Sequence, residues 1–230
     1  MPGYATRRNQ LETYFDRTAS ANWARLTSDA PVSGIRATVR AGRDTVRDTL
    51  LSWLPEDMAG LRLLDAGCGT GALANAAAAR GAEVVAVDLA ATLIACACER
   101  AEGLPGPQPQ FLVGDMLAPE HGEFDHVVAM DSLIHYEAPD IVAALARIAP
   151  RVRRSIVFTV APRTHLLAAM HAIGRLFPQG DRAPAIAPLA EAKLRALIAA
   201  EPALAEFRPG RHHRVTTGFY MSHAFEWVRG

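Results

Sequence analysis

Short apolar segments alternate with polar or alanine-rich segments through the middle of the chain. The apolar segments occupy residues 61–64, 84–87, 111–114, 126–130 and 155–160. Short continuous apolar runs between turn signals are typical of strands that are buried on both faces of a parallel sheet. The intervening segments are long enough for helices, so the pattern predicts an α/β fold with a mostly parallel sheet.

The flanking segments follow other patterns. Residues 7–54 are predicted to be helical and to end before Pro55, because apolar residues recur there at helical spacing: Ile35, Val39, Val46, Leu50, Leu51 and Leu54. Residues 190–200 are predicted to form a helix. Residues 211–215 and 218–228 are predicted to form a final antiparallel hairpin, so we expect a Rossmann-like sheet of seven strands in which only the last runs antiparallel.

The predicted organisation is an N-terminal helical cap, residues 1–55, followed by one α/β domain, residues 56–230. Within that domain, residues 161–190 are rich in Pro, Gly and Arg. A long excursion of this kind at the ligand-binding edge of a sheet is typical of a substrate lid.

Composition excludes several classes of protein. The 230 residues have a formal net charge of zero, which gives no support for a general affinity for nucleic-acid phosphates. The three cysteines form no Cys-x-x-Cys pair, which fits a reduced, cytoplasmic protein. No apolar run is long enough to span a bilayer.

The segment Asp65-Ala-Gly-Cys-Gly-Thr-Gly71 carries the clearest chemical signal. It follows an apolar strand and precedes an alanine-rich helix, and glycines 67, 69 and 71 let a ligand approach the backbone closely. A carboxylate beside such a turn suits the ammonium of S-adenosylmethionine (SAM), and the helix N-terminus favours its carboxylate. We therefore predict a SAM site that includes Asp65, Gly67, Cys68, Gly69 and Gly71.

Three further strands end in an acid. Asp88 lies about twenty residues beyond the turn, the usual position for an acid that binds ribose hydroxyls. Asp115 and Met116 suit the amine and the ring of an adenine. Ligands bind at the carboxyl ends of the strands in open α/β sheets, so the predicted SAM site extends to Asp88, Leu89, Asp115, Met116 and Asp131.

Two alternatives stay open for these residues. Any single acid after a strand is also explained as a helix N-cap. A dinucleotide such as NAD is the runner-up ligand, although the third glycine comes one residue earlier than in Gly-x-Gly-x-x-Gly.

A row of arginines lies within the predicted N-terminal helix, on a face that also carries Asp44 and Asp48: Arg36, Arg40, Arg43 and Arg47. This pattern fits a solvated, ion-paired face. It also fits a basic edge that faces an anionic substrate or a membrane surface, and the sequence leaves both interpretations open.

Several segments outside the predicted SAM site resemble one family. They are Tyr14-Phe-Asp-Arg17, Met130-Asp-Ser-Leu-Ile-His-Tyr136, Phe158-Thr-Val-Ala-Pro-Arg-Thr164, residues 175–186 and Gly218-Phe-Tyr-Met-Ser222. Together they resemble the magnesium-protoporphyrin IX O-methyltransferases of bacteriochlorophyll synthesis, which are class I SAM-dependent methyltransferases. The resemblance extends from about Tyr14 to Trp227.

The resemblance implies an activity and the residues that carry it. A propionate carboxylate of the porphyrin takes the SAM methyl group, giving a monomethyl ester and S-adenosylhomocysteine (SAH), and no protein-bound metal is implied. Since a carboxylate has a pKa of about 4.3, it is already ionised and needs no strong base. The implied catalytic pair is His135 and Tyr14, and the implied substrate-binding residues are Arg163, Arg175, Phe177, Arg182 and Tyr220. The three arginines among them suit the second, unreacting propionate, because Arg binds carboxylates bidentately.

Partner and location follow from the resemblance alone. It implies the magnesium-protoporphyrin IX substrate, delivery by the large subunit of magnesium chelatase, and a cytoplasmic protein that associates peripherally with the photosynthetic membrane. Two alternatives are a SAM-dependent methyltransferase for another aromatic or quinone acceptor, and a non-catalytic porphyrin-binding regulator. A phenolic acceptor, with a pKa near ~10, would need a base or a metal.

Overall fold

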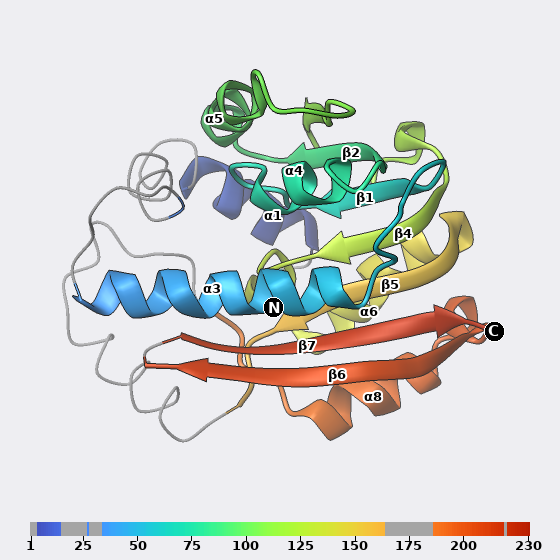
Figure 1. Cartoon of the computed structure of the whole chain (residues 1–230). Helices are drawn as coiled ribbons and strands as arrows, with labels where there is room; N and C mark the ends of the chain where they lie inside the picture. Colours follow the sequence, from blue (N-terminus) through green and yellow to red (C-terminus); the bar gives the residue numbers. More distant parts are fainter. Residues whose placement is uncertain (1–3, 15–26, 28–33, 164–185, 219) are drawn as a thin grey trace.

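The computed structural model describes residues 4–14, 27, 34–163, 186–218 and 220–230 (Figure 1). Its centre is a seven-stranded sheet in the order β3-β2-β1-β4-β5-β7-β6. The strands are β1 Arg62–Ala66, β2 Glu83–Asp88, β3 Gln110–Val113, β4 Phe124–Ala129, β5 Val152–Val160, β6 Phe207–Thr217 and β7 Tyr220–Arg229. The pairs among β1 to β5 are parallel, whereas β7 is antiparallel to both neighbours. The predicted Rossmann-like architecture is confirmed.

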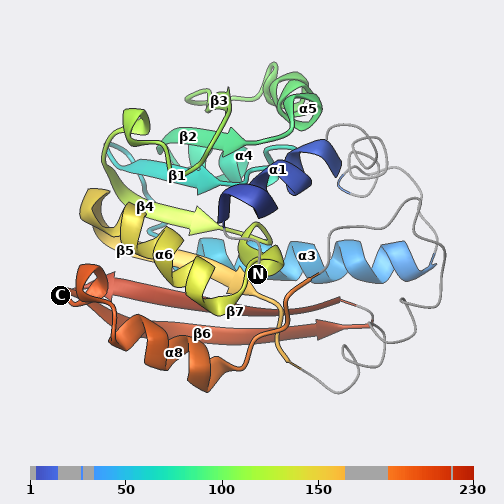
Figure 2. The same ribbon diagram turned by 180° about the vertical axis from the view of Figure 1, so that it is seen from behind.

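Helices cover both faces of this sheet. They are α1 Tyr4–Tyr14, α3 Gly34–Ser52, α4 Ala72–Ala78, α5 Ala91–Ala101, α6 Ala138–Ile148 and α8 Glu191–Ala199, with short 3₁₀ turns η2 Pro119–His121, η3 Leu133–His135, η4 Ala149–Arg151 and η5 Pro202–Leu204. Helices α3 and α4 lie over one face, and α1, α6 and α8 lie over the other (Figures 1 and 2). None of the helices in the described ranges is long and apolar enough to cross a bilayer.

The sheet is buried on both sides, which explains the continuous apolar runs. Leu64, Val127 and Ile156 belong to the cluster under α6 and α8. Their chain neighbours Leu63, Val128 and Val157 belong to the cluster under α3 and α4. Successive strand side chains point to opposite faces, so each strand of such a sheet needs apolar residues at consecutive positions.

Helix α3 contributes to the core through one apolar stripe. Its residues Val46, Leu50 and Leu51 are buried in the same cluster as β-strand residues Val215 and Ala224. The helix therefore lies along the sheet over the β6–β7 hairpin (Figure 1). The division of the chain at residue 55 into a cap and a domain stays a prediction.

The last hairpin is longer than predicted. Strand β6 begins at Phe207 rather than at residue 211, and its register shifts between Pro209 and His212. Proline and glycine at positions 209 and 210 are typical of such an irregularity at a sheet edge. Because both residues are unusual inside strands, the sequence pattern did not predict the first part of β6.

The predicted lid, residues 161–190, is described only at its two ends. The Arg163 N–H donates to the Leu189 carbonyl at 2.9 Å, and the Leu189 N–H donates to the Ala161 carbonyl at 2.8 Å. The Ala187 N–H donates to the Ile134 carbonyl, also at 2.8 Å. Both ends of the predicted lid therefore meet beside the turn that carries His135. Residues 164–185 lie outside the described residues.

Candidate active site

The glycine turn between β1 and α4 has a backbone that requires glycine. Gly67, Gly69 and Gly71 have φ values of 83°, 54° and 78°, in the left-handed region that other residues rarely adopt. A Cβ at position 67 would lie 2.3 Å from the Cβ of Ser132, in the loop after β4. The turn therefore packs tightly against the loop that follows β4.

Two buried carboxylates lie at this turn. Asp65 is 1% exposed, and its Oδ2 has no hydrogen-bond partner among the described residues. Burial, reinforced by the negative charge of Asp88, raises the pKa of Asp65 to about 7. Asp88 accepts hydrogen bonds from the Gly69 N–H at 2.9 Å and from the Ala90 N–H at 3.0 Å, yet burial still raises its pKa. The pair creates a negative site that favours a cationic ligand.

Both acids line a pocket with a cavity volume of about 320 Å³. That volume is typical of a small-molecule site. Most of the predicted cofactor residues, together with the predicted catalytic histidine, line it: Asp65, Gly67, Cys68, Gly69, Asp88, Leu89, Met116, Asp131 and His135. The structure therefore brings together the carboxyl ends of β1, β2 and β4 and the residues that follow β3.

Asp131 lines the pocket and connects three elements of the fold. It is the one non-glycine residue with positive φ in the described ranges, at 53°. Its carboxylate accepts from the Arg43 guanidinium at 2.6 Å and from the Tyr220 hydroxyl at 2.9 and 3.0 Å. The Thr159 hydroxyl donates to it at 3.2 Å. A strained backbone held by three partners is typical of a functional position.

Asp115 has a different environment from the one predicted for an adenine ligand. Its carboxylate accepts hydrogen bonds from the Tyr4 hydroxyl at 2.8 Å, the Leu117 N–H at 2.9 Å and the Arg8 guanidinium at 3.2 Å. Burial opposes its ionisation, but these hydrogen bonds outweigh burial and lower its pKa. The pocket is lined by Gly114 and Met116 on either side of it, so a role for Asp115 in adenine binding stays a prediction.

The remaining predicted residues fall into two groups. His135, at the end of η3, is 7% exposed and lines the pocket. Gly71, Tyr14, Arg163 and Tyr220 are not among the described lining residues, and Arg163 is exposed. Arg175, Phe177 and Arg182 lie outside the described residues. The catalytic role of Tyr14 and the substrate-binding roles stay predictions.

Sequence reasoning missed an aromatic part of the pocket wall. Tyr4 of α1 stacks on Tyr136 with ring centroids 5.1 Å apart, and both line the pocket beside Leu11. Tyr136 directly follows His135 and is the last residue of the 130–136 segment, so the sequence could have indicated it. Tyr4 lies near the start of the chain, and no spacing connects it to the site.

The arginine row on α3 forms another wall. Arg40, Arg43 and Arg47 line the pocket, whereas Arg36 is exposed and does not. Arg47 also donates to Asp44 at 2.8 Å and to Asp48 at 3.1 Å. The row is therefore ion-paired along the helix while three of its arginines line the pocket, and a role toward an anionic substrate or a membrane surface stays a prediction.

The chain is similar to a group of methyltransferases along its whole length. Residues 129–229 match a family model described as the magnesium-protoporphyrin IX methyltransferase C-terminus, and residues 63–155 match a methyltransferase domain. A magnesium-protoporphyrin O-methyltransferase of Rhodobacter capsulatus is 48% identical, with 97% of both chains covered. One from Synechocystis is 31% identical over 95% of both chains. The crystal structure of magnesium protoporphyrin IX methyltransferase from Synechocystis PCC 6803 with bound SAH has a TM-score of 0.85 at 29% identity, covering 97% of this chain and all of that one.

Proposed function

The chain belongs to the magnesium-protoporphyrin O-methyltransferase family, and on that premise we propose how its pocket carries out the reaction. It is a SAM-dependent enzyme that methylates magnesium-protoporphyrin IX in (bacterio)chlorophyll synthesis. We propose that the acceptor atom is a propionate oxygen and that the pocket separates the donor from the acceptor by charge. The observation that carries the proposal is the buried Oδ2 of Asp65 in the pocket wall, which has no hydrogen-bond partner in the part of the chain that the structure describes.

The acidic side of the pocket binds SAM. Asp65 accepts the ammonium of the methionine part, because an unpaired buried carboxylate gains most from a cation. Asp88 keeps lone pairs beyond its two backbone bonds, and these accept the ribose hydroxyls. Leu89 and Met116 supply apolar surface for the adenine. The methyl group then points toward Asp131 and His135.

The acceptor reaction joins opposite charges. As the propionate oxygen forms its bond to the methyl carbon, the sulfur–methyl bond breaks and its electron pair stays on sulfur. A carboxylate anion and a sulfonium cation thus become a neutral ester and neutral SAH. Charge disappears along this path, so a pocket that excludes water favours it. Alignment of oxygen, carbon and sulfur supplies the largest part of the reduction in the activation barrier, roughly 7–11 kcal/mol for a well-oriented pair.

His135 and the α3 arginines hold the acceptor. The His135 imidazole either donates to the reacting carboxylate or contacts the porphyrin magnesium through an axial water, and neither role requires it to remove a proton. Tyr14 is the second proposed catalytic donor. Arg40 supplies the bidentate contact for the unreacting propionate, because it lines the pocket on a helix fixed to the sheet.

The test is product formation with a matched substrate control. The protein, SAM and magnesium-protoporphyrin should give the monomethyl ester and equimolar SAH, both measured by mass spectrometry. The dimethyl ester of the same porphyrin has no free propionate and should release no SAH. SAH formation from the dimethyl ester would show that another atom is methylated.

A second measurement tests the catalytic pair. His135→Ala and Tyr14→Phe should each lower kcat at least tenfold while the Kd for SAM stays within twofold of the parent. Full turnover by His135→Ala would remove His135 from the mechanism.

We also propose that the substrate arrives from the large subunit of magnesium chelatase and that the enzyme associates loosely with a membrane. The support is the family membership and the apolar substrate. Substrate bound to the purified large subunit should be methylated faster than the same concentration of free substrate. Sedimentation with lipid vesicles tests the membrane association.

A further inference from the structure

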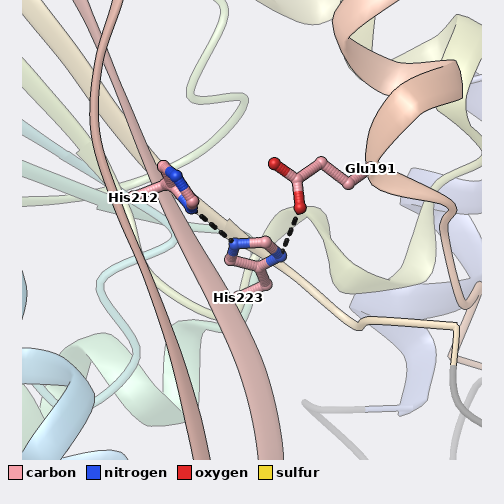
Figure 3. Close-up of side chains that lie close together, drawn as sticks. All are labelled: Glu191, His212 and His223. Carbon is pink, nitrogen blue, oxygen red and sulfur yellow. Dashed lines mark hydrogen bonds and ion pairs between the residues drawn. The ribbon is translucent and has the colours of Figure 1, made fainter.

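A second group of side chains with metal-binding chemistry lies at the far end of the sheet from the glycine turn. Glu191 is the first residue of α8, His212 lies on β6, and His223 lies on β7 (Figure 3). None of the three lines the SAM pocket. The established methyl transfer requires none of them.

The three side chains converge on one another. The His223 Nε2 lies 3.4 Å from the His212 Nδ1, and the His223 Nδ1 lies 3.7 Å from a Glu191 carboxylate oxygen. One ligand atom from each residue lies within 4.8 Å of the other two. His223 stands between its two partners, and their polar atoms point toward it (Figure 3).

These distances suit a transition-metal ion. Two nitrogens bound to one zinc ion at about 2.0–2.1 Å in tetrahedral geometry lie roughly 3.3 Å apart, close to the separation of the two imidazoles. Glu191 lies 3.7 Å from Nδ1, the other nitrogen of the His223 ring, so its side chain must rotate to bring an oxygen to an ion held by His223 Nε2 and His212 Nδ1. A set of two imidazoles and one carboxylate binds zinc and similar transition-metal ions in preference to magnesium or calcium.

The surroundings support ligand binding. The Arg195 guanidinium holds the other Glu191 oxygen, Oε1, at 2.8 Å, which orients the carboxylate as an outer-shell partner does in metal sites. The His223 ring packs on Phe225 with centroids 4.1 Å apart, so its position is fixed. His212 is exposed and offers an entry path.

We propose that Glu191, His212 and His223 form a binding site for one divalent transition-metal ion of the zinc class. The ion ties the first turn of α8 to the β6–β7 hairpin, and water completes its coordination. Its role is structural, since it holds α8 beside Leu189, where the predicted lid rejoins the fold.

Metal titration of the untagged full-length protein tests the site. After treatment with a chelator and its removal, calorimetric titration with Zn²⁺ should show one equivalent bound with a micromolar or lower Kd. The same ion should raise the melting temperature. Co²⁺ should give a visible ligand-field spectrum without a thiolate charge-transfer band, because the ligands are nitrogen and oxygen rather than the cysteines.

Variants assign the ligands. His212→Ala and Glu191→Gln should each weaken Zn²⁺ binding at least tenfold and abolish the melting shift, while SAH binding confirms that each variant is folded. His213→Ala is the matched control, because it removes the next imidazole on the same strand and should leave Zn²⁺ binding unchanged. The proposal is overturned if no stoichiometric Zn²⁺ binds, or if His212→Ala binds as tightly as His213→Ala. Either outcome would leave the three residues as a hydrogen-bonded chain only.

Discussion

The two walls of the SAM pocket carry opposite charge and have different origins. One wall consists of Asp65 and Asp88 at the ends of β1 and β2, both buried and with raised pKa values. The other consists of Arg40, Arg43 and Arg47 on α3. The acids come from strands that are neighbours in the sheet, whereas the arginines reach the pocket only because the apolar stripe of α3 packs on that sheet.

The comparison separates donor binding from acceptor binding. In the function proposed above, the acids attract the cationic methyl donor and the arginines attract the anionic acceptor. A single pocket of mixed charge would then bring the sulfonium and the carboxylate together in the orientation that the reaction needs. Four predictions test how far the two walls act independently.

The largest effect is expected for Asp65→Asn. Loss of the buried charge that pairs with the SAM ammonium should raise the Kd for SAM roughly 100-fold or more. The ligand-free protein should become more stable at pH 8, because the parent must keep a buried carboxylate ionised there. A gain of about 2–4 °C in melting temperature is expected per kcal/mol relieved. Calorimetric SAM titration and thermal unfolding measure the two effects, and a variant that loses both affinity and stability would contradict this account of Asp65.

A smaller effect is expected for Arg43→Met, which breaks the ion pair between the arginine wall and Asp131, after the end of β4. Asp131 would stay buried with only Tyr220 and Thr159 as partners, at a cost of about 2–3 kcal/mol in the free energy of unfolding. The control Arg47→Met removes an arginine whose partners, Asp44 and Asp48, are exposed, and should cost at most about 1 kcal/mol. Urea unfolding of both variants distinguishes the two, and equal losses would mean that the Arg43–Asp131 pair is not special.

The acceptor side is tested by Arg40→Gln. Loss of a charge-assisted contact to the second propionate, about 1.5–2 kcal/mol, should raise the KM for the porphyrin more than tenfold and leave the Kd for SAM unchanged. Arg36→Gln changes the same residue type one turn earlier on the same helix, where it is exposed. The two variants should differ in steady-state kinetics, and identical KM values would remove Arg40 from the acceptor site.

The smallest effect is a pH dependence of SAM binding. The pKa of Asp65 in the free enzyme is raised to about 7, so the carboxylate that pairs with the ammonium is increasingly protonated below that pH. The Kd should therefore be constant above about pH 8 and about tenfold higher at pH 6. Ligand-free stability runs the other way, falling as pH rises toward 7, because the folded state holds the proton more tightly than the unfolded chain. Asp65→Asn should abolish both dependences.

The sequence predicted the fold, and predicted that residues of the glycine turn and Asp88 meet in the pocket, for local reasons. The acid, the glycines and the following helix lie within one short segment, and their φ values require the residue type that the motif shows. The strand order follows from buried apolar runs joined by helices. Asp88 could be placed because the carboxyl ends of parallel neighbours meet at one edge of the sheet.

The remainder depends on contacts between distant segments. Nothing in the sequence indicated that Tyr4 and Arg8, more than a hundred residues away, donate to the Asp115 carboxylate, and the predicted contact of Asp115 with the adenine stays a prediction. Neither has a periodic or motif signal in the sequence. The arginine row could be read in two ways, because periodicity shows which residues share a face and not which partner that face meets. The Glu191–His212–His223 cluster combines three separate elements and was invisible for the same reason.

The paired ends of residues 161–190 have a consequence for how this family can diversify. Backbone hydrogen bonds join Arg163 to Leu189 and Leu189 to Ala161, and the Ala187 N–H donates to the Ile134 carbonyl next to His135. These hydrogen bonds do not depend on side-chain identity, and the buried Leu189 side chain also fixes this end in the core. Lengthening a flexible loop between fixed ends is also inexpensive, at about 0.6 kcal/mol per doubling. We therefore expect that the sequence between these two ends can change in length and composition at little cost to the pocket beside the glycine turn.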